Sequence, residues 1–114
     1  TGTLIRLFDY KDDKTMNELM KTSDIIINGT QIGMGEDKSL PVASMCEVNS
    51  THVLVDLIYH PLETEFLKQG KRTGALTING LGMLVHQAAH AFKLMTKKEM
   101  PVTAIEEMLT EQWQ

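Results

Sequence analysis

Apolar residues recur along the chain with two periods, which predict strands and helices in alternation. Continuous apolar runs, typical of buried parallel strands, lie at Leu4–Phe8, Asp24–Ile27, His52–Ile58 and Ala75–Ile78. Apolar residues spaced three or four apart predict helices that begin near Lys14, Thr64, Leu81 and Pro101. The segment Gln31–Ser50 has no regular period, so we expect mostly loop there.

This order of elements predicts an α/β fold, because strands that alternate with helices pair in parallel through right-handed crossovers. We expect an incomplete Rossmann-like parallel sheet of about four strands, with flanking helices and two C-terminal helices. Three runs should form a parallel core in the order Asp24–Ile27, Val53–Ile58 and Ala75–Ile78. Leu4–Phe8 should lie beside the first of them or pair with another copy of the chain, which leaves a homo-oligomer open.

Local signals mark the helix ends and one buried charge. Asp12 or Asp13 is predicted to cap the first helix and Thr64 the second, while Gly74 suits the position just after the second helix. Asp56 lies within an apolar run, so its carboxylate must find hydrogen-bond donors if it is buried.

Composition narrows the class of protein. A chain of 114 residues with 42% apolar and 23% charged residues fits one globular domain. The net charge of −4 gives no general reason to expect nucleic acid or an anionic membrane as partner. Cys46 is the single cysteine, so no intrachain disulfide is possible, and no run resembles a signal peptide or a bilayer span. These features predict a cytoplasmic location.

The helix that begins at Leu81 carries one polar side chain, Gln87, on the shoulder of its apolar stripe. The stripe comprises Leu81, Leu84, Val85, Ala88, Phe92 and Met95. An uncharged amide there can satisfy a neighbouring backbone group or reach a polar ligand, and spacing alone favours the backbone role.

Two segments resemble known chemical motifs, but each lacks a residue that the motif requires. The segment from His86 to His90 has the spacing of a zinc helix, but Gln87 stands where the general-base Glu is needed. Gly80 to Val85 follows a strand as a dinucleotide fingerprint does, but Val85 replaces the third glycine. We therefore expect neither a metal site nor a complete phosphate-binding loop, and we assign no residue as a catalytic acid or base.

Three longer segments resemble the shikimate and quinate/shikimate dehydrogenases. The segment NGLGMLVHQAAHAF, residues 79–92, resembles the family signature GxGMLxxQAAxAF. DIIINGTQIGM, residues 24–34, and VLVDLIYHPLETEFL, residues 53–67, match in the right order. The N-terminal substrate domain and the glycine-rich fingerprint of such enzymes have no counterpart, so the resemblance implies the C-terminal part of a longer protein. Residues 1–95 would be half of an NAD(P)-binding domain, and residues 96–114 a closing helix that packs on the substrate domain.

The resemblance also implies particular site residues. The matched positions are Tyr59 and Gln87 for the substrate, Leu57 and Gly80 for the nicotinamide end of the cofactor, and Asn28 and Thr30 for the nucleotide-facing loop. The Lys and Asp that such enzymes use in hydride chemistry have no match in this chain, so the chain alone is expected to be inactive.

The implied function is that of an oxidoreductase of the shikimate pathway. Such an enzyme interconverts 3-dehydroshikimate and shikimate, or dehydroquinate and quinate, by hydride exchange with NADP or NAD. The sequence leaves both the cofactor and the acid open. An alternative is a non-catalytic nucleotide-sensing or interaction module that has kept this half-domain.

Overall fold

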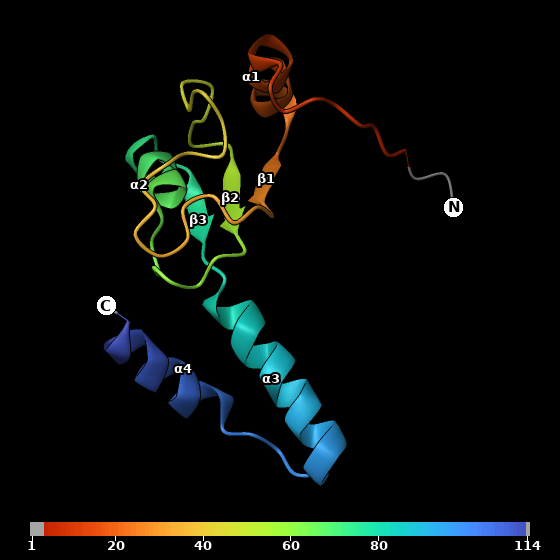
Figure 1. Ribbon diagram of the computed structural model, residues 1–114, viewed down its shortest axis with the longest axis vertical. Coiled ribbons are helices and arrows are strands. Elements are labelled where there is room, and N and C mark those ends of the chain that lie inside the picture. Colours follow the sequence, from red (N-terminus) through yellow and green to blue (C-terminus); the bar gives the residue numbers. More distant parts are fainter. Residues whose placement is uncertain (1–3, 114) are drawn as a thin grey trace.

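The computed structural model describes residues 4–113 and contains four helices and three strands within them. In chain order these are α1 Asp13–Thr22, β1 Ile25–Asn28, β2 Val53–Asp56, α2 Glu65–Arg72, β3 Leu76–Ile78, α3 Leu81–Thr96 and α4 Val102–Gln112 (Figure 1). The predicted helices are all present, and Gln31–Ser50 contains no helix or strand. The α/β class and the two C-terminal helices are therefore confirmed.

The sheet has three parallel strands in the order β1-β2-β3, as the apolar runs predicted. Its register places Ile25 beside Val53 and Val53 beside Leu76. The count of about four strands was too high, because the expected strand Leu4–Phe8 is irregular chain that runs away from the sheet (Figure 1). Ile5 is 81% and Leu7 93% exposed, so this run has neither a strand partner nor a covering layer.

One face of the sheet carries the hydrophobic core. Alternate residues point to opposite faces of a strand, and the side of Leu54 is covered by α2 and by the loop before β2. The buried core consists of Met20, Met45, Val48, Leu54, Phe66, Leu67 and Ala75. On the other face Ile25, Ile27, Leu76 and Ile78 are each between 48% and 62% exposed. The sheet therefore presents an uncovered apolar face.

The helix ends follow the sequence signals. The Asp12 Oδ1 atom accepts from the Thr15 backbone N–H at 3.2 Å, and hydrogen bonds from Thr15 lower the pKa of Asp12 below its ordinary value. Thr64 caps α2 by accepting from the Leu67 N–H. Gly74 has a φ of 91°, a conformation that residues with a Cβ rarely adopt.

A buried histidine joins α1 to β2. The His52 ring is 1% exposed, and its Nδ1 accepts from the Asn49 backbone N–H at 3.0 Å. The Nε2 atom therefore carries the proton and donates to the Met20 carbonyl oxygen at 2.7 Å. Both ring nitrogens are satisfied, so His52 has a structural role.

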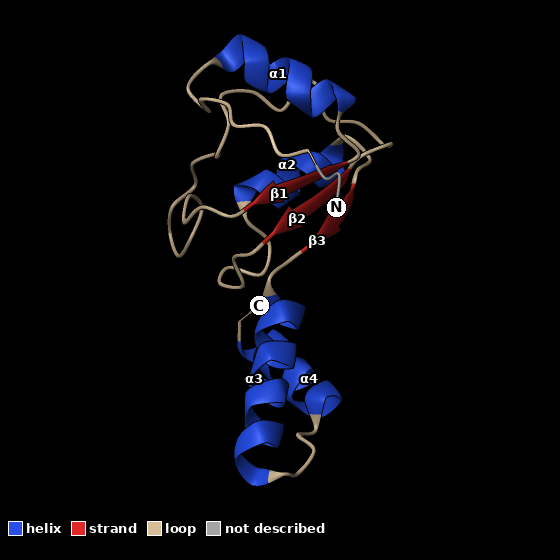
Figure 2. Cartoon of the chain, turned by 90° about the vertical axis from the view of Figure 1, so that its right-hand side faces the viewer, coloured by secondary structure: helices blue, strands red, loops and turns tan. Residues whose placement is uncertain are grey.

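The α3–α4 pair lies beyond the carboxyl ends of the strands, clear of the sheet (Figures 1 and 2). Lys97 ends α3 with a φ of 61°, and α4 then packs back along α3. The predicted apolar stripe of α3 is only partly covered, since Leu81 and Val85 are buried whereas Ala88 and Met95 are exposed. No helix formed by residues 4–113 combines the length and apolar character that a bilayer crossing demands.

Candidate ligand-binding site

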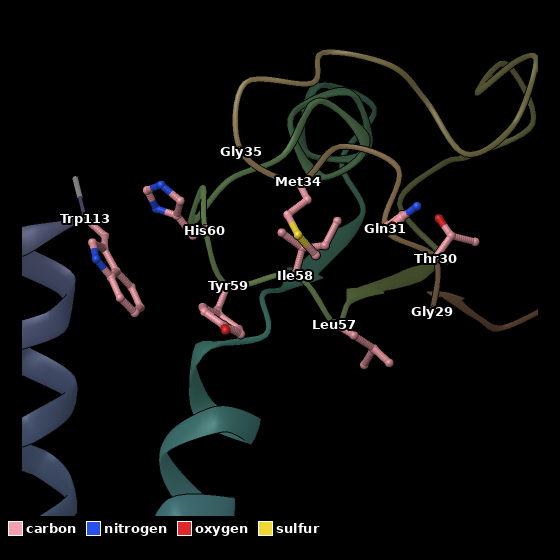
Figure 3. A pocket seen from close by; sticks show the side chains of 10 residues that line it. All are labelled: Gly29, Thr30, Gln31, Met34, Gly35, Leu57, Ile58, Tyr59, His60 and Trp113. Carbon is pink, nitrogen blue, oxygen red and sulfur yellow. The ribbon is translucent and has the colours of Figure 1, made fainter.

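A pocket of about 530 Å³ opens at the carboxyl edge of the sheet (Figure 3). In open parallel sheets this edge is where ligands bind, because the loops after the strands meet helix N-termini there. The pocket is lined by Gly29, Thr30, Gln31, Met34, Gly35, Leu57, Ile58, Tyr59, His60 and Trp113. The walls of the pocket are therefore formed by the loops after β1 and β2 and by the end of α4.

Asn28 organises the loop after β1. Its side chain is 3% exposed, and its Oδ1 atom accepts from both the backbone N–H and the hydroxyl of Thr30, at 3.1 and 2.7 Å. Its Nδ2 atom donates to the Ile32 carbonyl oxygen and to the Asp56 carboxylate, each at 3.2 Å. The Asn28 amide is therefore occupied by the protein itself, and Thr30 is the exposed member of the pair.

Asp56, at the end of β2, is the hub of this buried polar network. It is 0% exposed and accepts three hydrogen bonds: Oδ1 from Asn28 Nδ2 and from the Ile58 N–H at 3.0 Å, and Oδ2 from the Thr64 hydroxyl at 2.6 Å. The expected donors for this charge are confirmed. Asp56 thereby holds together the loop after β1, the loop after β2 and the start of α2.

Gly80 joins the third strand to the same edge. Its N–H donates to the Ile58 carbonyl oxygen at 3.0 Å, and a Cβ built on it would overlap the Leu57 carbonyl group. Its φ of −83° is open to any residue, so the requirement for glycine is one of space. The N-terminus of α3 is in this way locked against the backbone of Leu57 and Ile58.

The loop of residues 31–39 forms the opposite wall. The Asp37 carboxylate accepts from the Ser39 N–H at 2.8 Å and the Gly33 N–H at 3.0 Å. Hydrogen bonding from the Ser39 side chain first, and then from the Gly33 and Ser39 backbone N–H groups, lowers the pKa of Asp37 below its ordinary value, so the loop is held by an ionised carboxylate. The Gly35 N–H donates to the His60 carbonyl oxygen at 3.0 Å, which ties this wall to the loop after β2.

Trp113 closes the pocket from the side of α4. Its indole stacks on the Tyr59 ring with centroids 5.6 Å apart and an interplanar angle of 26°. It also lies 5.7 Å from the His60 ring in a tilted arrangement, and the three side chains stand together in Figure 3. Aromatic pairs in such geometry attract each other beyond the area they bury.

The structure brings together only part of the predicted site. Thr30, Leu57 and Tyr59 line the pocket, the Gly80 N–H is hydrogen-bonded to the Ile58 carbonyl oxygen, and Asn28 is buried at the end of β1. These five positions therefore belong to one edge of the sheet.

Gln87 is separate from this group. It does not line the pocket, and it is exposed on α3. Spacing alone favoured a role for the Gln87 amide in satisfying a neighbouring backbone group, and this interpretation was wrong, because the exposed side chain forms no hydrogen bond with the described part of the chain.

Several pocket residues escaped the sequence analysis. Met34, Gly35 and His60 belong to irregular chain without a periodic signal, and Trp113 was not assigned to the site. Thr64 was recognised as a helix cap, but its second role as a donor to Asp56 depends on tertiary contact.

The lining is mostly apolar and aromatic. Among the lining residues within 4–113 none is Lys, Arg, Asp or Glu, and the polar side-chain groups come from Thr30, Gln31, Tyr59, His60 and the indole N–H of Trp113. Apolar and aromatic walls with a few polar groups suit a flat ring bearing polar substituents. The described part of the chain holds no cluster of three or more His, Cys, Asp or Glu side chains that could bind a metal ion.

Comparison with known proteins places these features in a family. Residues 80–110, from Gly80 through most of α4, match the family described as Shikimate 5'-dehydrogenase C-terminal domain. A shikimate dehydrogenase (NADP(+)) of Streptococcus pneumoniae is 40% identical over all 114 residues, which is 40% of its own length. The chain thus spans about 40% of the length of the curated relative it matches.

Solved structures agree with the sequence relatives. Shikimate 5-dehydrogenase from Listeria monocytogenes, in complex with shikimate and NAD, superposes with a TM-score of 0.83 at 34% identity, over 91% of this chain and 36% of that one. Quinate dehydrogenase from Corynebacterium glutamicum, in complex with NAD, gives 0.78 at 28% identity, over 87% of this chain and 35% of that one. With the sheet order and the glycine junction in place, the chain belongs to the shikimate dehydrogenase family and corresponds to its C-terminal portion.

Proposed function

We propose that the chain is the cofactor-side portion of an NADP- or NAD-dependent dehydrogenase that acts on shikimate or quinate. The observation that carries this proposal is the junction at the carboxyl edge, where Gly80 is locked against Leu57 and Ile58 beside an apolar pocket. Relatives with the same architecture are described in complex with shikimate and NAD, or with NAD.

The nicotinamide end of the cofactor fits this edge. Leu57, Ile58 and Met34 offer apolar surface to a flat ring, and Gly29 leaves the backbone of the loop after β1 open to close approach. When bound, NADP or NAD supplies the hydride chemistry. The lining residues of the described chain include no cation for the phosphates, so we propose that the phosphates are held by parts of the full-length protein outside this chain.

Tyr59 and Gln87 are proposed to contact the acid. Tyr59 is 38% exposed at the pocket, and Gln87 is exposed on α3 with its amide free to accept and donate. A hydroxylated ring carboxylate offers matching polar groups. Tyr59 and Gln87 are not acids or bases of suitable strength near neutral pH, and the resemblance implies a catalytic Lys and Asp, so we propose that these come from the substrate domain of the full-length protein.

The uncovered face of the sheet supports the proposal that this chain acts as part of a larger protein. Ile25 and Ile27 on β1, with Leu76 and Ile78 on β3, form an apolar face that water disfavours. We propose that other parts of the full-length protein cover it, rather than a second copy of the chain.

A second candidate is a nucleotide-sensing or interaction module without catalysis. The lining of the pocket is compatible with it, because the lining residues within 4–113 include no Lys, Arg, Asp or Glu. The two candidates differ in whether a Lys- and Asp-bearing domain accompanies this chain.

Steady-state assays of the full-length protein distinguish the candidates. We expect shikimate- or quinate-dependent reduction of NADP or NAD by the full-length protein, and no turnover by the 114-residue chain alone. All four combinations of acid and cofactor should be measured, because the sequence leaves both the acid and the cofactor open. Nucleotide binding without turnover of either acid would support the sensing module instead.

In the full-length protein, Gln87→Ala is expected to raise the KM for the acid. The loss of a hydrogen bond to a charged or hydroxylated ligand costs about 1–3 kcal/mol, which is about 5- to 150-fold in KM. The KM for the cofactor should stay within about twofold, because the proposed contact is with the acid.

The matched control for Gln87 is His90→Ala, which removes another exposed polar side chain one turn later on α3. This variant should leave both Michaelis constants unchanged. Unaltered acid kinetics in Gln87→Ala would remove Gln87 from the proposed substrate contacts.

A further inference from the structure

The backbone around Tyr59 is held on both sides. The Ile58 N–H donates to Asp56 Oδ1 at 3.0 Å, and the Ile58 carbonyl oxygen accepts from the Gly80 N–H at 3.0 Å. On the other side, the His60 carbonyl oxygen accepts from the Gly35 N–H at 3.0 Å. The Cα atom of Tyr59 is thereby fixed, and only its two side-chain torsions remain free.

The Tyr59 side chain itself has one strong restraint. Its hydroxyl forms no hydrogen bond with the described part of the chain, and 38% of the residue is exposed. The Trp113 indole, stacked at 5.6 Å, covers one face of the ring. The direction in which the Tyr59 hydroxyl points therefore depends on Trp113.

Trp113 is placed by α4 and not by the sheet. It caps the C-terminus of α4, where its N–H donates to the Leu109 carbonyl oxygen at 3.0 Å. α4 packs on α3, and α3 begins at Gly80, which is bonded to Ile58. A continuous series of contacts therefore runs from the loop after β2, through α3 and α4, and back to the ring of Tyr59.

We propose that Trp113 is a positioning residue that sets the Tyr59 ring for the ring-carboxylate substrate and so links substrate binding to the packing of α4. This role rests on the proposed function and deepens it, since it adds a determinant of substrate affinity outside the segments that carry the family signature. Trp113 acts through Tyr59, and its indole forms the wall that limits how far a bound ring can move toward α4 (Figure 3).

The kinetic test uses the full-length protein. Trp113→Ala should raise the KM for the acid about five- to tenfold, the scale of a lost aromatic stack, with the KM for the cofactor within about twofold. Trp113→Phe keeps a stacking ring and should stay within about threefold of the parent. Met108→Ala, which removes an exposed side chain of the same helix, is the matched control and should change neither constant.

A double-mutant cycle separates positioning from general support of the fold. In a Tyr59→Leu background, Trp113→Ala should add no more than about a twofold increase in the KM for the acid, because the ring that Trp113 positions is already gone. Equal effects of Trp113→Ala with and without Tyr59 would overturn the proposal. So would a loss of kcat for every substrate combination with the KM for the acid unchanged.

A spectroscopic test in the 114-residue chain needs no turnover. Trp113 is the single tryptophan, so its emission reports its own surroundings. Tyr59→Leu should shift the emission to longer wavelength and weaken the near-ultraviolet circular dichroism, whereas Tyr10→Leu, at an exposed tyrosine, should not. An unchanged spectrum in Tyr59→Leu would mean that the stack is absent and would overturn the proposal.

The outcomes distinguish this inference from the proposed function. Absence of shikimate and quinate turnover by the full-length parent protein would overturn the proposed function and, with it, this role of Trp113. Turnover by the parent together with an additive cycle would overturn the role of Trp113 alone. Turnover, a non-additive cycle and a shifted spectrum together support it.

Discussion

Asp56→Ala is expected to lower the free energy of unfolding by about 3 kcal/mol or more, because each buried donor left without an acceptor costs about 1–3 kcal/mol. The three donors are Asn28 Nδ2, the Ile58 N–H and the Thr64 hydroxyl, which all meet the fully buried carboxylate. The loss is measurable by urea unfolding of the chain monitored by circular dichroism.

Asp56→Asn is the control that separates hydrogen bonding from the loss of volume. Its remaining carbonyl oxygen can still accept from Asn28 and Ile58, while its amide can donate to the Thr64 hydroxyl oxygen. We expect a loss of about 1 kcal/mol for this variant. Equal stabilities of the Ala variant and the parent would show that the network does not hold the loops together.

Gly80→Ala is the second substitution with a large expected effect. The added methyl group overlaps the Leu57 carbonyl group and would lie 2.9 Å from the Ile58 carbonyl carbon, so backbone and not a movable side chain must give way. We expect a loss at or above the upper end of the range of about 1–3 kcal/mol for overpacking. Urea unfolding of the chain measures it, and the loss should be accompanied by weaker protection of the Gly80 N–H from hydrogen exchange.

Gly82→Ala provides a matched comparison two residues later. Its added methyl group has one neighbour, Glu106 Oε1, at an ordinary 3.8 Å, and Gly82 lies within α3. Alanine there should stabilise the chain by up to about 1 kcal/mol through helix propensity. If both substitutions had the same sign and size, close approach at Gly80 would not be the reason for its glycine.

Both large effects concern the same edge of the sheet. Asp56 fixes the start of the loop after β2 through Ile58, and Gly80 fixes the same residue from the side of α3. The pocket is therefore built on a rigid frame, and the proposed function would require such a frame to place the substrate and cofactor rings. Stability and ligand binding are expected to fall together when this frame is changed.

Much of the fold could be predicted from local patterns. Capping by Asp12 and Thr64 and the left-handed Gly74 depend on neighbours a few residues away, so the sequence indicates them directly. The parallel order of three strands follows from short apolar runs separated by helices, because right-handed crossovers leave few arrangements. The apolar run Leu4–Phe8 also predicted a strand. That prediction was wrong, because the run has no partner strand.

The site was predictable only in part. Thr30, Leu57 and Tyr59 stand just after the predicted strands, so the rule that ligands bind at the carboxyl edge brings them together. The stacking of Trp113 on Tyr59 has no local signal, because it depends on how α3 and α4 leave the sheet and return.

The sequence by itself determined the four helices, the order of the three observed strands, the caps at Asp12 and Thr64 and the need of Asp56 for donors, since each depends on short-range periodicity or on the chemistry of one residue. Only the tertiary structure decided which faces are covered and that Leu4–Phe8 forms no strand. It leaves Gln87 exposed on α3, buries Asn28 and brings Trp113 onto Tyr59. These outcomes depend on contacts between segments far apart in the chain, and a pattern of apolar residues shows that a face needs cover without showing which segment supplies it.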